Sequence, residues 1–273
     1  MLLVHAQGDK VNVYVCPVCG APLLREGNAF RCENRHSYDI SASGYVNLTP
    51  PAAGRYGDDA EMVAARRAFL NKGHYDPLRR AVCDMLSASS PKTLLDAGCG
   101  EGYYTKSVCE ALPGAVVYGV DVSKKAVEKA SKFCGQASFC VASVYRMPYA
   151  DRSFDAILNV FSPLAPEEYL RTLRPGGSLV MAVPAPDHLI ELKRAVYDDV
   201  FIKEMKDDAL DGFSKQDVKR IAFTMELDGT TLKELFGMTP YAKKTSPADR
   251  AKLDFVDRLS VTASFFVYRY TKF

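Results

Sequence analysis

The sequence predicts an α/β fold, in which a small metal-binding module precedes a mostly parallel, doubly wound sheet. Three observations support this prediction. Cysteines and a histidine cluster within the first 36 residues, and apolar runs of strand length alternate with amphipathic helical segments from about residue 93. A long strand pattern then covers residues 258–270. The 273 residues are enough chain for one large domain and a small appendage.

Composition divides the chain into three regions. Residues 1–49 are rich in Cys, Gly, Asn and aromatic residues, in short runs that cannot build a hydrophobic core without a staple. Residues 50–58, PPAAGRYGD, form a linker rich in proline and glycine. Residues 59–273 carry the α/β pattern. We therefore expect a small N-terminal module, a linker and one large domain.

Four candidate metal ligands lie in the N-terminal region, with the spacing C-x2-C-x12-C-x3-H: Cys16, Cys19, Cys32 and His36. A CxxC turn brings two thiolates to one ion, and a second pair about 12 residues later closes a tetrahedron across a hairpin. Four ligands leave no open position, which indicates a structural zinc. The alternative, a redox CxxC beside an unrelated Cys and His, fits the spacing less well. We expect zinc to supply the folding energy that this short segment lacks.

The large domain is expected to begin with two helices. The segment AEMVAARRAFLNKG places Met62, Phe69 and Leu70, with Ala65, on one stripe and ends at Gly73. A second helix is expected over about 75–88. Five buried strands follow, in the segments TLLDAG, AVVYGVDV, ASFCVASV, FDAILNVF and GSLVMAVP. The intervening segments YYTKSVCEAL and SKKAVEKASKFC are expected to be helices, the latter capped by Ser123.

The end of the chain is expected to close the sheet. Residues 187–221 are expected to be helical, most clearly in DHLIELKRAVYDDVF. The segments TMELDG and RLSVTASFFVYRY read as strands, with the helix TLKELFGM between them. Such an ending predicts a terminal strand pair that makes the last strand antiparallel to its neighbours.

Composition and charge exclude several classes of protein. No apolar run approaches the roughly 20 residues of a membrane helix, and the first residues do not resemble a signal peptide, so we expect a cytoplasmic protein without a membrane partner. The net charge of +2 carries no general signal for nucleic acid. A local basic face could be formed by Arg55, Arg66, Arg67, Lys72, Arg79 and Arg80. The five remaining cysteines are expected to be reduced core residues: Cys83, Cys99, Cys109, Cys134 and Cys140.

The first strand of the large domain leads into the loop D-A-G-C-G-E-G. Gly98, Gly100 and Gly102 allow a turn and the close approach of a ligand at the carboxyl end of the strand. A glycine triplet alone is a weak signal, because dinucleotide enzymes use a similar one. Here Asp96 precedes the loop, and Asp121 ends the next strand, where a carboxylate can accept hydrogen bonds from ribose hydroxyls. These features resemble class I methyltransferases with a Rossmann-like sheet, which use S-adenosylmethionine.

Downstream segments extend this resemblance. MPYADRSFDAILNVFSP resembles the third and fourth strand region of that class, which would place Met147 to Asp151 by the adenine and Asp155 at the start of a strand. LRPGGSLVMAVP is similar to the turn before the fifth strand.

A more specific resemblance runs through most of the first 195 residues. CPVCGAPL, CENRHSYDISASGYVNL, GDDAEMVAARRAFLNKGHYDPL, LDAGCGEGYYT and APDHLIELK resemble the 23S ribosomal RNA (guanine-N1)-methyltransferases of the RlmA group. The resemblance implies methylation of a guanine in a hairpin loop of 23S ribosomal RNA by a homodimer. One subgroup of this family confers resistance to macrolides such as tylosin.

The resemblance also implies residue roles at the cofactor. Tyr75 would cover S-adenosylmethionine, Gly100 and Glu101 would contact it at the loop, and Asp121 would bind its ribose. His188 would lie near its amino-acid end.

The substrate side of the site is less defined by the sequence. Guanine N1 carries a proton at neutral pH, so methyl transfer requires a base or a hydrogen-bond acceptor. Asn159 and Ser162, in NVFSP, are candidates for the substrate pocket, but neither is basic. Asp39, Asp58 or a backbone carbonyl acting with solvent remain alternatives for the proton acceptor. The RNA cleft is expected to have the zinc module as one wall and the C-terminal edge of the sheet as the other. The candidate RNA contacts on the module are Arg25, Arg31, Arg35 and Tyr38, and those across the cleft are Arg66 and Arg67.

Two other functions remain open. FDAILNVF and RPGG also occur in methyltransferases of small molecules, although these usually have no N-terminal zinc site. A catalytically inert RNA-binding or resistance scaffold is the second alternative, which the intact DAGCGEG loop and Asp121 disfavour.

Overall fold

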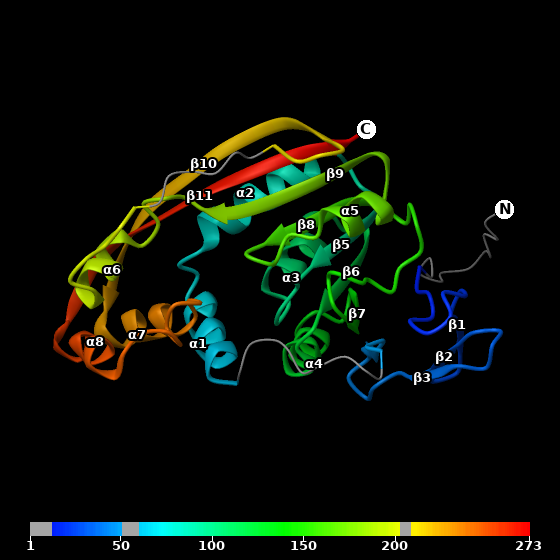
Figure 1. The fold of residues 1–273 in the computed structure, drawn as a ribbon, viewed down its shortest axis with the longest axis horizontal. Coiled ribbons are helices and arrows are strands. Elements are labelled where there is room, and N and C mark those ends of the chain that lie inside the picture. Colours follow the sequence, from blue (N-terminus) through cyan, green and yellow to red (C-terminus); the bar gives the residue numbers. More distant parts are fainter. Residues whose placement is uncertain (1–12, 51–59, 203–208) are drawn as a thin grey trace.

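The structure is a computed structural model that describes residues 13–50, 60–202 and 209–273. An eight-stranded sheet runs through it in the order β10-β11-β9-β8-β5-β6-β7-β4 (Figure 1). The strands are β4 (Val46–Asn47), β5 (Thr93–Ala97), β6 (Val116–Asp121), β7 (Ser138–Val141), β8 (Phe154–Val160), β9 (Leu173–Pro184), β10 (Phe213–Asp228) and β11 (Arg258–Lys272). Strands β4 to β9 are parallel, and β11 runs antiparallel to both β9 and β10. The mostly parallel sheet with an antiparallel terminal strand is confirmed.

The helices are α1 (Ala60–Asn71), α2 (Asp76–Ser87), α3 (Tyr103–Ala111), α4 (Lys124–Phe133), α5 (Pro166–Thr172), α6 (Ile190–Val196), α7 (Gly229–Gly237) and α8 (Pro247–Ala251), followed by a 3-10 turn (Lys252–Phe255). The first four match the expected helices to within a few residues. Ser123 caps α4 as predicted, because its Oγ accepts a hydrogen bond from Ala126 N at 3.4 Å. No helix in the described ranges is long and apolar enough to cross a membrane.

Successive residues of the central strands point to opposite faces of the sheet and pack into two separate hydrophobic cores. Leu94 and Val117 pack with α2, α3 and α4 on one face. Leu95 and Tyr118 pack with α5 and with residues from the N-terminal region on the other face. This burial on both faces explains why the parallel strands read as continuous apolar runs.

The N-terminal region contains a small antiparallel sheet, made of β1 (Leu24–Glu26), β2 (Ala29–Arg31) and β3 (Ser37–Asp39). This sheet lies at one end of the molecule, and α6, α7 and α8 lie at the other (Figure 1). The same region is joined to the large sheet, because β4 pairs with β7. In addition, the Tyr14 ring stacks on the Tyr149 ring with their centroids 5.4 Å apart. The N-terminal region therefore supplies an edge strand and part of a core to the large domain.

The prediction of helix over 187–221 is wrong for most of the described part of that range. Helix α6 covers only Ile190–Val196, and β10 begins at Phe213. Strand β10 pairs along its whole length with β11, and most of its residues are partly or fully exposed. Long-range pairing, which local sequence does not reveal, overrides the helical pattern there.

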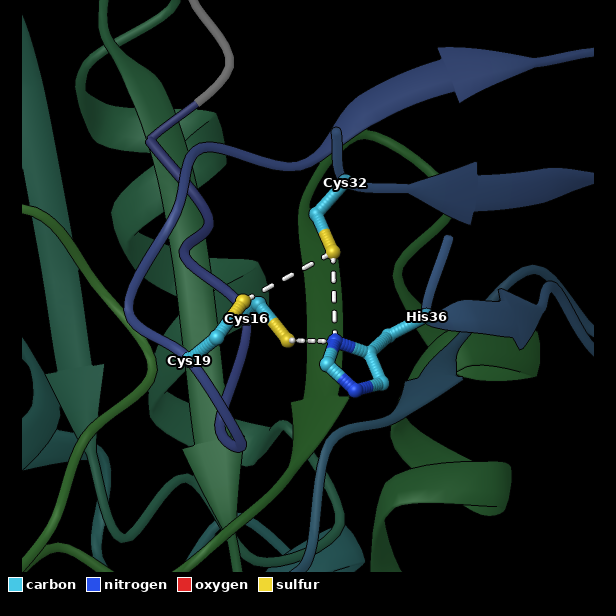
Figure 2. A group of neighbouring side chains, drawn as sticks. All are labelled: Cys16, Cys19, Cys32 and His36. Atoms are coloured by element: carbon cyan, nitrogen blue, oxygen red, sulfur yellow. Dashed lines mark hydrogen bonds between the residues drawn. The ribbon is translucent and has the colours of Figure 1, made fainter. Parts of the chain in front are cut away.

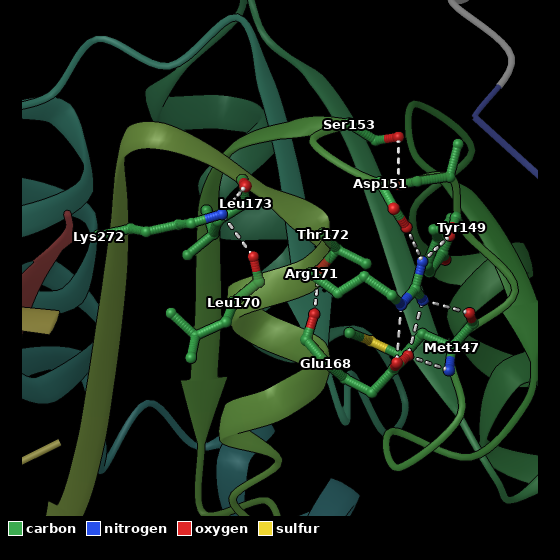
Figure 3. A network of polar contacts seen from close by, with 11 residues as sticks. Met147, Tyr149, Asp151, Ser153, Glu168, Leu170, Arg171, Thr172, Leu173 and Lys272 are labelled. Atoms are coloured by element: carbon green, nitrogen blue, oxygen red, sulfur yellow. Dashed lines mark hydrogen bonds and ion pairs between the residues drawn. The ribbon is translucent and has the colours of Figure 1, made fainter. Parts of the chain in front are cut away.

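Arg171 fixes the loop that leads from β7 to β8 (Figure 3). Its guanidinium donates to Met147 O at 2.9 Å and to Tyr149 O at 2.6 Å, and it forms ion pairs with Glu168 and Asp151. These contacts hold the loop against helix α5. They therefore also fix the position of the preceding residues 143–146 at the edge of the sheet.

Candidate zinc centre and cofactor cavity

The four predicted metal ligands come together in the N-terminal region (Figure 2). The Sγ atoms of Cys16 and Cys32 lie 3.5 and 3.4 Å from Nδ1 of His36. The Sγ atoms of Cys19 and Cys32 are 3.7 Å apart, and all four ligand atoms lie within 4.8 Å of one another. Turns on either side of the β1–β2 hairpin bring the two pairs together.

These distances fit a tetrahedral zinc ion. With Zn–S bonds of about 2.3 Å and Zn–N bonds of about 2.0 Å, a tetrahedron places two sulfurs about 3.8 Å apart and a sulfur and a nitrogen about 3.5 Å apart. Two further groups approach the sulfurs: Tyr38 OH lies 3.2 Å from Cys16 Sγ, and Asn34 Nδ2 donates to Cys19 Sγ at 3.3 Å. Such outer contacts orient ligands in metal sites.

A cavity of about 1890 Å³ opens where the parallel strands end at their carboxyl edge. Residues that follow β5, β6, β7, β8 and β9 line it, as expected for a ligand site in a sheet of this kind. A pocket for one small ligand usually measures roughly 300–1,000 Å³. The cavity therefore has room for a cofactor and for a substrate group beside it.

Six of the eight predicted cofactor residues line this cavity: Tyr75, Gly98, Gly100, Glu101, Asp121 and His188. Gly100 has a φ of +52° and faces open space, since a Cβ there would meet no atom within 4 Å. Asp121 supports the loop, because its two carboxylate oxygens accept hydrogen bonds from Gly100 N at 3.0 Å and Ser123 N at 2.8 Å. The loop thus presents main chain to the cavity.

The other two, Asp96 and Gly102, do not line the cavity and lie behind the loop. Asp96 is 2% exposed, and Thr105 Oγ1 donates to it at 2.6 Å. Burial, together with the charge of Asp121, raises the pKa of Asp96 to about 7, although the hydrogen bond from Thr105 opposes this rise. Gly102 precedes α3, and a Cβ there would lie 3.1 Å from the Cβ of Ala130 in α4.

Tyr75 and His188 belong to an aromatic cluster beside the cavity. The Tyr75 ring packs edge-on against Phe265 at 5.1 Å, and the His188 ring lies 4.5 Å from Phe265. Burial lowers the pKa of His188 to about 3, so its ring is neutral at physiological pH. Ser264 N donates to His188 Nδ1 at 3.2 Å. The proton of the neutral ring therefore sits on Nε2, which makes that atom a donor.

The two predicted substrate-pocket residues differ in position. Ser162 lines the cavity, and its buried Oγ has no hydrogen-bond partner among the described residues. Asn159 is buried behind the turn, where its Nδ2 donates to Pro163 O at 3.1 Å and to Tyr169 OH at 2.6 Å. The Ser162 hydroxyl faces the glycine loop, because a Cβ added to Gly98 would lie 2.0 Å from Ser162 Oγ.

Other predicted neighbours of the ligand also lie elsewhere. Residues 143–146 line the cavity, whereas residues 147–151, expected by the adenine, do not. Asp155 is held by Thr93 and Arg174 away from the cavity lining. Asp39 is an exposed residue of β3 outside the lining, and Asp58 lies outside the described residues.

Cationic side chains outnumber acidic ones around the cavity. The acidic residues of the described lining are Glu101 and Asp121. The cationic ones are Arg66, Arg67, Arg146, Lys193 and Lys243. Of the predicted basic face, Lys72 pairs with Glu234, Arg79 pairs with Asp76, and Arg55 lies outside the described residues. Arg146, Lys193 and Lys243 were missed by the sequence analysis, because only the path of their loops and helix brings them to the cavity.

The strand order, the glycine loop and the cavity at the carboxyl edge define a class I methyltransferase that uses S-adenosylmethionine. Two comparisons with protein families agree. Residues 94–177 match the family described as "Methyltransferase domain", and residues 14–53 match the zinc ribbon described as "RlmA, N-terminal".

Relatives identify the family more closely. The 23S rRNA (guanine(748)-N(1))-methyltransferase of Streptomyces fradiae is 33% identical over 96% of this chain and 98% of its own length. The YxjB protein of Bacillus subtilis is 35% identical over 89% of this chain and 90% of its own. A demethylmenaquinone methyltransferase of Tropheryma whipplei, at 34% identity, spans only 42% of this chain. The chain belongs to the family of 23S rRNA (guanine-N1)-methyltransferases.

Proposed function

We propose that this protein transfers a methyl group from S-adenosylmethionine to N1 of a guanine in a hairpin loop of 23S ribosomal RNA. The observation that carries the proposal is the cavity, which has room for two ligands and a cationic lining. Cationic groups are the usual contacts of RNA phosphates. The N-terminal zinc ribbon and the near full-length relatives that act on 23S rRNA support this substrate.

The cofactor is proposed to lie against the glycine loop. The main chain at Gly98 and Gly100 would contact it, Glu101 and Asp121 would accept its hydrogen bonds, and Tyr75 would cover it. Asp96 and Gly102 would shape the loop from behind. His188, a neutral donor through Nε2, would serve its carboxylate end. S-adenosylmethionine supplies an electrophilic methyl group when it is bound.

The zinc ion is proposed to be structural. Cys16, Cys19, Cys32 and His36 would fill all four of its positions, which leaves none for a substrate. We further propose that residues 1–49 recognise RNA, that residues 59–273 carry out methyl transfer, and that residues 50–58 join them. Of this linker, only Pro50 lies in the described part of the chain.

The proton on guanine N1 needs an acceptor. Both acidic residues in the described lining are engaged, Glu101 with Lys129 at 3.0 Å and Asp121 with the glycine loop. His188 is a donor in its neutral form. We therefore propose that a main-chain carbonyl at the cavity wall accepts a hydrogen bond from N1–H and that water takes the proton as the methyl group is transferred, with Ser162 beside the base in the substrate pocket.

Assembly and location are part of the proposal. The family resemblance supports a homodimer, which light scattering during size-exclusion chromatography would test. The ribosomal substrate and the eight cysteines, none of which forms a disulfide in the described residues, support the cytoplasm. Protection from macrolides would be tested by comparing drug sensitivity in cells with and without the gene.

The decisive experiment uses ribosomal RNA from a strain that lacks the methyltransferase. Labelled cofactor should transfer its methyl group to this RNA, and primer extension should stop at one guanine in a hairpin loop. Transfer of label to small molecules alone would favour the small-molecule alternative. Absence of cofactor binding at millimolar concentration, measured by calorimetry, would favour an inert scaffold.

A further inference from the structure

The turn that follows β8 holds an aromatic residue in an unusual backbone conformation. Phe161 has a φ of +56°, in the left-handed region that a bulky side chain rarely adopts. No other aromatic residue in the described part of the chain has a positive φ of this kind. Leu189 has a similar φ of +55° but is buried, whereas the Phe161 side chain is 44% exposed and lines the cavity.

The surroundings of the turn impose this conformation. Phe161 N donates to Ala182 O at 3.2 Å, which holds the start of the turn on β9. Pro163 O accepts hydrogen bonds from Asn159 Nδ2 at 3.1 Å and Tyr169 OH at 3.2 Å, both from buried residues. Backbone strain persists only where neighbours over-determine it, and such places cluster at functional sites.

The turn is also packed against the glycine loop. A Cβ added to Gly98 would lie 2.0 Å from Ser162 Oγ, so the two segments are in direct contact. The Phe161 ring lies 5.4 Å from the ring of Phe265, which in turn contacts His188 and Tyr75. Phe161 is therefore the exposed end of an aromatic cluster whose buried end adjoins the proposed cofactor position.

A planar ring at this position matches a planar ligand. A guanine in a loop must leave its neighbours to reach a methyl donor, and extruded bases are commonly held by stacking on aromatic side chains. The strained main chain holds the Phe161 ring exposed at the cavity wall. A base can therefore stack on this ring without a rearrangement of the turn. The adjacent Ser162 packs against Gly98, so the Phe161 ring stands directly beside the glycine loop.

Building on the proposed function, we propose that Phe161 stacks on the target guanine and so aligns N1 with the methyl donor. The cationic residues of the cavity lining would hold the flanking phosphates, and Phe161 would hold the base itself. Phe161 is then a substrate-binding residue that contacts the reacting base.

The test compares three substitutions by their kcat/KM on unmodified 23S ribosomal RNA. Phe161→Tyr keeps an aromatic ring and should stay within about threefold of the wild type. Phe161→Leu and Phe161→Asn remove it and should lower kcat/KM by about 5- to 150-fold, the usual value of one stacked base. Asn tolerates the left-handed conformation well, so Phe161→Asn should fold normally while losing activity. The cofactor Kd should stay within twofold in all three.

An RNA hairpin without the target base separates stacking from a structural effect. Wild type and Phe161→Leu should bind this abasic hairpin equally, although they differ on the intact hairpin. If the wild type does not methylate the RNA, the proposed function fails. If the wild type methylates it and Phe161→Leu keeps wild-type kcat/KM, or weakens abasic and intact hairpins alike, the stacking role is overturned and the proposed function stands.

Discussion

Two carboxylates beside the glycine loop differ in what surrounds them. Asp121 lines the cavity and also holds Gly100 in place, whereas Asp96 is buried behind the loop with Thr105. The sequence identified both as acidic neighbours of the loop, because Asp96 directly precedes the glycines and Asp121 ends the next strand. It could not separate their roles, since burial depends on how α3 and α4 pack over the strand ends.

The first residue-scale prediction concerns the cofactor loop. Asp121→Ala should raise the Kd for S-adenosylmethionine about 5- to 150-fold, because charged hydrogen bonds of roughly 1–3 kcal/mol are lost. Gly100→Val should abolish binding, since its side chain would enter the ligand space and Val is strained at a φ of +52°. Titration calorimetry measures both, with Asp39→Ala as a matched control at an exposed residue outside the cavity lining. Wild-type affinity in both variants would place the cofactor elsewhere.

The second residue-scale prediction concerns pH. The pKa of Asp96 is about 7 in the folded protein, above the ordinary value of 3.8. The folded state therefore holds a proton that the unfolded state releases, and Asp96 destabilises the fold increasingly as pH rises from 5 to 7. Asp96→Asn should gain stability relative to the wild type over this range, by at most about 1.4 kcal/mol per pH unit. Urea unfolding at pH 5, 6, 7 and 8 checks this, and a difference independent of pH contradicts it.

At the scale of elements, the parallel strands were predictable, whereas only the end of β10, in the segment TMELDG, was predicted as a strand. Strands such as β5 are buried on both faces, so they appear in the sequence as unbroken apolar runs. Strand β10 has mostly exposed polar and apolar residues and is held by β11, whose paired residues come between 30 (Asp228 with Arg258) and 59 (Phe213 with Lys272) positions later. Its strand character comes from that distant partner. The same limit applies to the site, because residues 143–146 reach the cavity only through the path of a loop.

The zinc prediction belongs to this scale, because it concerns the folding of the segment that carries β1 to β3. Purified protein should contain about one zinc per chain, and Cys16→Ser or Cys32→Ser should release it. The N-terminal segment should then become sensitive to protease, since it has too little core of its own. Metal analysis and limited proteolysis check this, with Cys83→Ser as the matched control outside the cluster. Freshly purified protein without zinc would contradict the assignment.

For the whole molecule, the question is which basic residues hold RNA. Arg66 and Arg67 line the cavity from α1, whereas Arg31 in the zinc module is paired with Glu26 at 3.2 Å. Replacing both Arg66 and Arg67 with alanine should weaken RNA binding and lower the slope of log K against log salt by about two. The double variant of Arg31 and Arg35 should also weaken binding if the zinc module forms the opposite wall.

Filter binding at several salt concentrations measures these slopes, and calorimetry shows whether cofactor affinity is unchanged. Equal slopes for wild type and the Arg66 and Arg67 variant would mean that the cavity lining does not carry the phosphate contacts.

The pairing of β4 with β7 sets an order of events during synthesis of the chain. Thr49 Oγ1 donates to Val141 O, a contact between residues 92 positions apart. When the first 50 residues leave the ribosome, the strand that they join has not yet been translated. Their buried side chains, such as Leu48 and Val46, must wait without a partner for several seconds at ordinary rates of translation. We expect bound zinc to keep the nascent N-terminal segment compact during this interval. Limiting zinc during synthesis should therefore lower the yield of folded enzyme more than removal of zinc inactivates enzyme that has already folded.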